Sequence, residues 1–150
     1  MSLKQQIDQD LKAAMLAGET QTVTVLRGLK GAVLNVEIQK GSREQGLNDD
    51  EMLAVLAKEA KKRQESADMY TQGDSPERAT AELEEKAIIE KYLPKQMSDE
   101  DLASAVDKAI ADTGAAGPQA MGQVIGAVKQ QVGGQADGAR IAQLVKEKLA

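Results

Sequence analysis

The chain of 150 residues contains no cysteine, histidine, tryptophan or phenylalanine, and its only aromatic side chains are two tyrosines. Without cysteine it cannot form a disulfide, a thiolate nucleophile or a cysteine-based zinc or iron–sulfur site. Without histidine there is no imidazole to serve as a general base or as a metal ligand. Two tyrosines alone do not make a platform on which the bases of single-stranded RNA could stack.

Long apolar runs and a basic charge balance are also missing. No stretch of about 18 apolar residues could span a bilayer, and the N-terminus turns polar at once, unlike a secretory signal peptide. We therefore expect a cytoplasmic location. The formal net charge of −5 differs from the strongly basic balance of non-specific nucleic-acid binders. We expect neither a membrane nor DNA as a partner.

Helical periodicity runs along almost the whole chain. Apolar residues recur at spacings of three and four, capping residues stand where each run begins, and glycine or proline stands where most of them end. The pattern predicts an all-α fold with seven helices, over approximately residues 3–17, 20–40, 49–72, 76–93, 99–112, 118–132 and 138–149. The second run carries apolar residues on several sides, Leu34 and Ile38 among them, which indicates the most buried helix of its bundle.

The segment from Pro94 to Ser98 is the best candidate for a domain boundary, because it separates longer helices from shorter ones. We expect a four-helix, bundle-like domain over residues 1–95 and a small three-helix domain over residues 98–150. No internal repeat is recognisable.

Nothing in the sequence indicates a catalytic site. No serine lies in a nucleophile elbow or has a histidine partner, and a fold without strands offers no phosphate-binding loop of the strand-to-helix kind. Glu82, Glu84 and Glu85 are interpreted as the solvated face of a helix. We expect no intrinsic enzymatic activity, no catalytic residue, no metal and no cofactor.

The densest group of positive charge is a short segment of the third expected helix. Its members are Lys58, Lys61, Lys62 and Arg63, and Arg27 and Lys30 of the second helix could add to it. One interpretation is contact with the phosphates of a structured RNA. The simpler interpretation, from the residues alone, is a solvated helix face whose charges pair with Glu59 and Glu65.

Several short motifs occur in the order found in one family. They are Leu26-Arg27, the stretch from Lys61 to Ser66, the boundary motif Tyr92-Leu93-Pro94, Met121-Gly122, and the turn with Gly134, Asp137 and Gly138. In this combination the chain resembles the YqeY-like family over nearly its full length. The same module also forms the C-terminal tail of the B subunit of glutamine-dependent aspartyl/glutamyl-tRNA amidotransferase, a carbon–nitrogen ligase with glutamine as amido donor.

The resemblance implies a helical N-terminal bundle followed by a small three-helix domain, and a role in gripping tRNA. The parts of the amidotransferase that perform the chemistry have no counterpart in this chain. One departure is Gln135, which stands where the family usually carries a basic residue in the turn.

Two functional hypotheses follow. The first is a stand-alone module that binds tRNA or associates with a tRNA-processing complex such as the amidotransferase. The second is a protein–protein adaptor that has lost the RNA role, which the acidic net charge favours.

Overall fold

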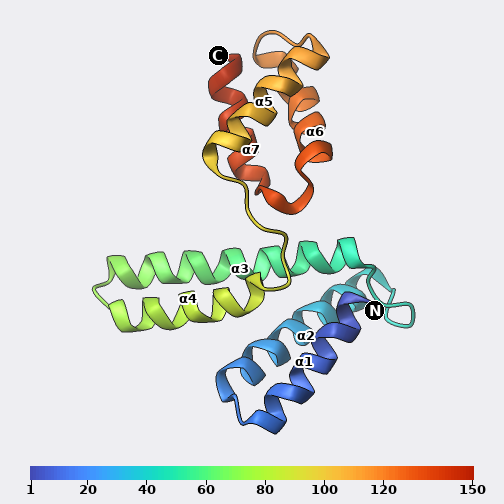
Figure 1. The fold of residues 1–150 in the computed structure, drawn as a ribbon, viewed down its shortest axis with the longest axis vertical. Helices are drawn as coiled ribbons and strands as arrows, with labels where there is room; N and C mark the ends of the chain where they lie inside the picture. Colours follow the sequence, from blue (N-terminus) through green and yellow to red (C-terminus); the bar gives the residue numbers. More distant parts are fainter. The chain divides into compact units, whose positions relative to one another are not determined.

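The computed structural model describes residues 1–150 and contains α-helices and short 3₁₀ helices but no β-strand (Figure 1). The all-α class is therefore confirmed. The elements in chain order are α1 (Leu3–Ala17), α2 (Thr20–Lys40), α3 (Asp49–Gln72), α4 (Pro76–Glu90), α5 (Asp99–Thr113), η1 (Pro118–Ala120), α6 (Met121–Val132), η2 (Gly133–Gln135) and α7 (Gly138–Leu149). None of these helices combines the length and the apolar character needed to cross a bilayer.

Most helix ends lie at the residues that the sequence predicts, because the caps are local devices. At the start of α3, the Asn48 side chain accepts a hydrogen bond from the backbone of Glu51, whose own side chain reaches back to Asn48. At the end of α2, Gly41 has a φ of 66°, the left-handed conformation that glycine adopts without steric cost. Ser75 is an exception, because its side chain forms no cap bond and only Pro76 marks the start of α4.

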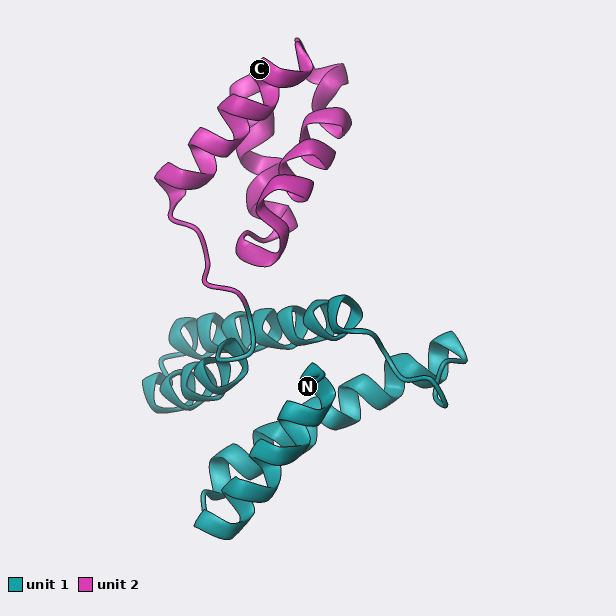
Figure 2. Ribbon diagram, turned by 45° about the vertical axis from the view of Figure 1, so that its right-hand side comes forward, with its two compact units in different colours: residues 1–93 teal, residues 94–150 magenta.

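The chain is divided into two compact units, Met1–Leu93 and Pro94–Ala150 (Figure 2). Each unit has its own hydrophobic core. Whether the two units fold independently, as the expected domains 1–95 and 98–150 would, stays a prediction.

The first unit consists of two helical hairpins, α1 with α2 and α3 with α4, which share one core (Figure 1). Its buried members come from all four helices and from the loop before α3: Ile7, Val25, Leu26, Leu29, Val33, Leu47, Met52, Val55, Leu56, Ala60 and Ile89. Three further buried alanines are not part of this cluster: Ala14 near the end of α1, and Ala67 and Ala79 in the outer half of the α3–α4 hairpin.

Helix α2 packs against α1, α3 and α4, as expected of the most buried helix of this unit, but not all of its apolar residues are covered. Leu34 and Ile38 remain 39% and 56% exposed, whereas Glu37 between them is only 2% exposed. The reason is that the three partners cover one broad face of α2, and they leave the side that carries Leu34 and Ile38 open.

The second unit is a three-helix arrangement of α5, α6 and α7. Its core is built mostly from small aliphatic side chains: Leu102, Ala105, Val106, Ala109, Val124, Val128, Val132, Ala136, Ile141, Val145 and Leu149. Small side chains suit a domain of this size, because they let short helices approach closely.

A direct test of the second unit compares two fragments, residues 94–150 and residues 98–150. The longer one retains the hydrogen bond from the Met97 amide to the Gln135 carbonyl (2.8 Å) and the Arg140 contacts to the Met97 carbonyl. We expect both fragments to be helical and the longer one to be more stable by about 1–2 kcal/mol. Urea unfolding followed by circular dichroism measures the difference, and equal stability would show that residues 94–97 are not part of this unit.

Candidate functional site

The basic segment of α3 presents three of its four cations to solvent. Lys58, Lys61 and Lys62 are exposed, and Arg63 is half-buried. Lys58 and Lys61 are three residues apart and therefore lie on neighbouring positions of one helix face. Neither of these two ammonium groups has an ion-pair partner, whereas Lys62 binds Glu59 at 3.2 Å. Lys58 and Lys61 are the cations of this segment that are left available for a phosphate.

Arg63 instead joins α3 to α4. Its Nε lies 3.0 Å from Glu85 and 3.9 Å from Glu82, and one terminal nitrogen lies 3.9 Å from Glu59. The prediction that these α4 carboxylates form a solvated face is wrong for Glu82 and Glu85, which are half-buried against this guanidinium. It is correct for Glu84, which is exposed and accepts a hydrogen bond from Gln21. Arg63 therefore contributes to helix pairing.

Arg27 and Lys30 of α2 engage α1 rather than the side chains of α3. Lys30 Nζ lies 2.7 Å from Asp8 Oδ1, and Arg27 Nη2 approaches the sulfur of Met15 at 3.9 Å. Both side chains are at exposed positions. The six basic residues singled out from the sequence therefore do not form one cluster of free charges. The two from α2 contact side chains of α1, and the charge of Lys30 is already balanced by Asp8.

The boundary motif begins with a hydrogen bond inside the first unit. Tyr92 donates its hydroxyl proton to Asp10 Oδ2 at 2.5 Å, which ties the residues after α4 to α1. Burial, together with the Asp10 carboxylate, raises the pKa of Tyr92 well above its usual range. The stabilisation is present below the ordinary tyrosine pKa of 10.0 and is lost as the pH rises toward the raised value. Leu93 packs against the same core.

The third residue of this motif contacts the glycine turn of the second unit. A Cβ atom added to Gly134 would lie 3.4 Å from the Pro94 ring, so the two residues are in close contact. Gln96 donates to the Gly134 carbonyl at 3.1 Å, and the Met97 amide donates to the Gln135 carbonyl at 2.8 Å. The side chain of Gln135 is exposed, and its backbone carbonyl accepts the bond from Met97.

Arg140 also holds the segment before α5, and it was not identified from the sequence. Its guanidinium donates to the Met97 carbonyl at 3.2 and 3.3 Å and to Asp99 at 2.7 Å. Its position two residues after Gly138 gave no signal, because an arginine in the first turn of a helix ordinarily faces solvent.

The other motif residues of the second unit differ in their surroundings. Met121 packs against the core, and a Cβ added to Gly138 would lie 3.5 Å from the Lys129 side chain. Gly122 is exposed and has open space where a side chain would stand. No cluster of three or more acidic side chains is placed to hold a metal ion.

Asp137 is the N-cap of α7, and its carboxylate accepts from the Ala139 amide at 2.6 Å. We expect Asp137→Ala to lower the free energy of unfolding by about 1 kcal/mol, because the Ala139 amide in the first turn of the helix then has no side-chain acceptor. Asp137→Asn keeps a capping oxygen and should cost only a fraction of that. Thermal unfolding of both variants checks the pair, and a large loss in the asparagine variant would indicate a role beyond capping.

Comparison with known proteins covers nearly the whole chain. A family model described as Yqey-like protein matches residues 4–149, which confirms the family resemblance. The chain is also 33% identical over 84 residues to a protein from Clavispora lusitaniae named Altered inheritance of mitochondria protein 41, mitochondrial. That alignment covers 56% of this chain and 47% of the relative, so it spans about half of each protein.

Proposed function

Because the chain belongs to the YqeY-like family, we propose that it is a tRNA-binding module that associates with tRNA amidotransferase or a related tRNA-processing complex. The observation that carries the proposal is the pair of exposed, unpaired ammonium groups of Lys58 and Lys61 on one face of α3. Phosphate contacts need lysine or arginine, and they position a protein on a folded RNA without reading its sequence.

The charge distribution predicts that this binding is weak and sensitive to salt. Lys62, Arg63 and Lys30 already have carboxylate partners, and the net charge of the chain is −5. A small number of phosphate contacts then has to act against the repulsion between the acidic protein and RNA. Such a module serves best as an auxiliary grip within a larger complex, in which other subunits supply the carbon–nitrogen ligase chemistry.

The test is the electrophoretic mobility of total tRNA with the purified chain at low and at physiological salt. We expect a mobility shift at low salt that weakens as the salt concentration is raised. In a plot of log affinity against log salt, each phosphate contact should add about 0.7–0.9 to the steepness of the slope. Absence of any shift at low salt would overturn the tRNA-binding proposal.

A protein–protein adaptor is the second candidate. The ion pairs of Arg63 with Glu82 and Glu85 favour this candidate, because they reduce the positive potential of the α3 surface. In that case the purified chain should leave tRNA mobility unchanged at low salt while still co-purifying with an amidotransferase or another partner.

For location we propose the cytoplasm. The name of the Clavispora lusitaniae relative assigns that protein to mitochondria, so fractionation of cells that contain the tagged chain distinguishes the two compartments.

A further inference from the structure

Helix α1 contributes few buried side chains to the first unit. Ile7 is its only buried member of the core cluster, to which α2 and α3 contribute four residues each. Helix α4 likewise contributes only Ile89, but it lies beside α3 along its length, and Arg63 pairs with its carboxylates (Figure 1). Few buried apolar contacts are typical of an element that opens before the rest of a domain.

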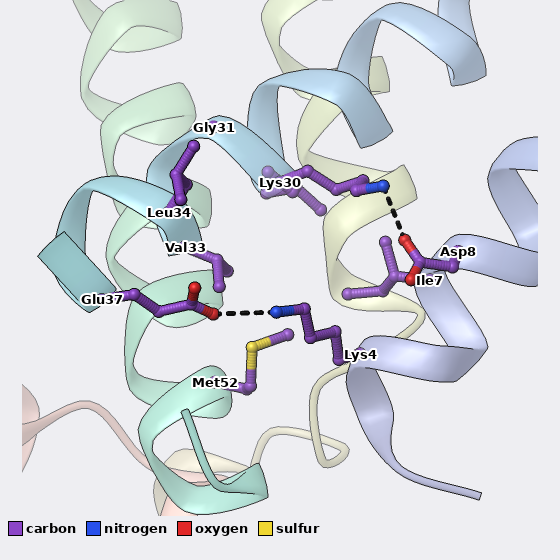
Figure 3. A pocket seen from close by; sticks show the side chains of 10 residues that line it. Lys4, Ile7, Asp8, Lys30, Gly31, Val33, Leu34, Glu37 and Met52 are labelled. Atoms are coloured by element: carbon purple, nitrogen blue, oxygen red, sulfur yellow. Dashed lines mark hydrogen bonds and ion pairs between the residues drawn. The ribbon is translucent and has the colours of Figure 1, made fainter. Parts of the chain in front are cut away.

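A gap in the packing lies beside Ile7. It is a surface cavity of about 260 Å³ between α1, α2 and the start of α3, and Leu29, Val33 and Met52 also line it (Figure 3). Side chains that line such a gap lack van der Waals partners on one side. The apolar contact between α1 and the other helices is therefore incomplete.

Polar contacts supply the rest of the attachment of α1, and each of the four includes a charged side chain. They join the Leu3 amide to Asp49 Oδ1 (3.0 Å), Lys4 Nζ to Glu37 Oε1 (3.1 Å), Asp8 Oδ1 to Lys30 Nζ (2.7 Å) and Asp10 Oδ2 to the Tyr92 hydroxyl (2.5 Å). Figure 3 shows the two ion pairs among them. The side chains of Asp8 and Lys30 are 40% and 45% exposed, and ion pairs with such exposure contribute little to stability. Helix α1 is thus held more by a few separate polar links than by a continuous apolar interface.

The connection between α1 and α2 can act as a hinge. It consists of Gly18 and Glu19, because α1 ends at Ala17 and α2 begins at Thr20. Gly18 has a φ of 73°, and glycine leaves this left-handed conformation at little steric cost. Glu19 forms no side-chain cap bond that a rotation would break.

We propose that α1 opens from the first unit as one body about Gly18, while α2, α3 and α4, which pack against one another, stay folded. The opening uncovers Leu29 and Met52 and releases the Tyr92 hydroxyl from Asp10. Helix α1 thereby acts as a latch on the boundary motif that begins at Tyr92. The inference is independent of tRNA binding, because it involves none of the exposed lysines of α3.

Native-state hydrogen exchange of the full-length chain, followed by NMR at single amides, tests the opening. We expect the amides of residues 7–17 to share one opening reaction. After correction for intrinsic rates, they should exchange at least about tenfold faster than the slowest amides of α2 and α3. Their exchange should also depend less on urea concentration, because opening α1 exposes less surface than global unfolding does.

Two matched pairs of variants identify the links that hold α1. Tyr92→Phe removes the hydroxyl that binds α1, whereas Tyr70→Phe removes one near the end of α3. Glu37→Gln removes the charge that pairs with Lys4 of α1, whereas Glu51→Gln removes one that pairs α3 with α2. We expect the first variant of each pair to speed exchange in α1 about tenfold, through loss of a hydrogen bond that involves a charged group, and the second to leave it unchanged. All four variants should fold, since each substitution nearly keeps the shape of the side chain.

Three outcomes would overturn the opening of α1 as a latch. If the amides of α1 had the same protection and urea dependence as those of α2 and α3, the helix would open only with the whole unit. Exchange that slows steadily from Leu3 to Ala17 would indicate fraying from the N-terminus instead of one opening reaction. Equal effects of Tyr92→Phe and Tyr70→Phe on α1 would show that the boundary motif is not coupled to this helix.

Discussion

Replacing Leu26 with alanine is expected to lower the free energy of unfolding of the first unit by about 3 kcal/mol. Leu26 is fully buried in α2, where it belongs to the core shared by the four helices. Its truncation removes apolar contacts and leaves a void that rigid neighbouring helices fill only in part. Urea unfolding followed by circular dichroism measures the loss.

The matched control is Leu34→Ala in the same helix. Leu34 is 39% exposed, so its truncation should cost well under half as much. If the two variants lost equal stability, the side of α2 that faces solvent in the free chain would have to be covered in solution, for example by a second copy.

Reversing the charge of Lys58 and Lys61 together is expected to weaken tRNA binding about tenfold or more. Both side chains are exposed and unpaired, so the Lys58→Glu, Lys61→Glu variant removes two phosphate contacts and adds repulsion. The slope of log affinity against log salt should fall by about 1.4–1.8, which is the contribution of two contacts. Mobility-shift titrations at several salt concentrations give both quantities.

The control changes the same total charge elsewhere in the first unit. Lys12 and Lys91 are also exposed and have no ion-pair partner, so Lys12→Glu, Lys91→Glu reproduces the charge change away from the basic segment of α3. We expect a smaller loss of affinity from it. Equal effects of the two variants would show that only net charge matters and would remove the assignment to α3.

The sequence was sufficient for the class of fold and for most helix ends, because both depend on neighbours along the chain. The capping box of Asn48 and Glu51 and the left-handed Gly41 are decided within one turn of helix. The exposed face of α2 could not be predicted in the same way. Its apolar residues on several sides indicate burial, but which side is covered depends on where α1, α3 and α4 pack.

The sequence predicts that basic residues of α3 cluster, but it does not predict which carboxylates pair with them. Helical spacing places Lys58 opposite the apolar stripe and Arg63 closer to its flank, but it does not show that Glu82 and Glu85 of the next helix hold Arg63 while Lys58 has no partner. Pairing across helices depends on the register of α3 against α4, which no local pattern specifies. The contact of Pro94 with Gly134 is likewise formed by residues forty positions apart along the chain.

The hydrogen bond between Tyr92 and Asp10 gives this protein an optical signal of its own. Because the chain contains no tryptophan, its near-ultraviolet emission comes from Tyr70 and Tyr92 alone, and Tyr70→Phe leaves a single fluorophore. A carboxylate that accepts the phenolic proton quenches tyrosine emission, so this fluorophore is dim while the 2.5 Å contact persists. Brightening on dilution into denaturant or on addition of a ligand then reports, without any attached label, that α1 has separated from the residues that follow α4.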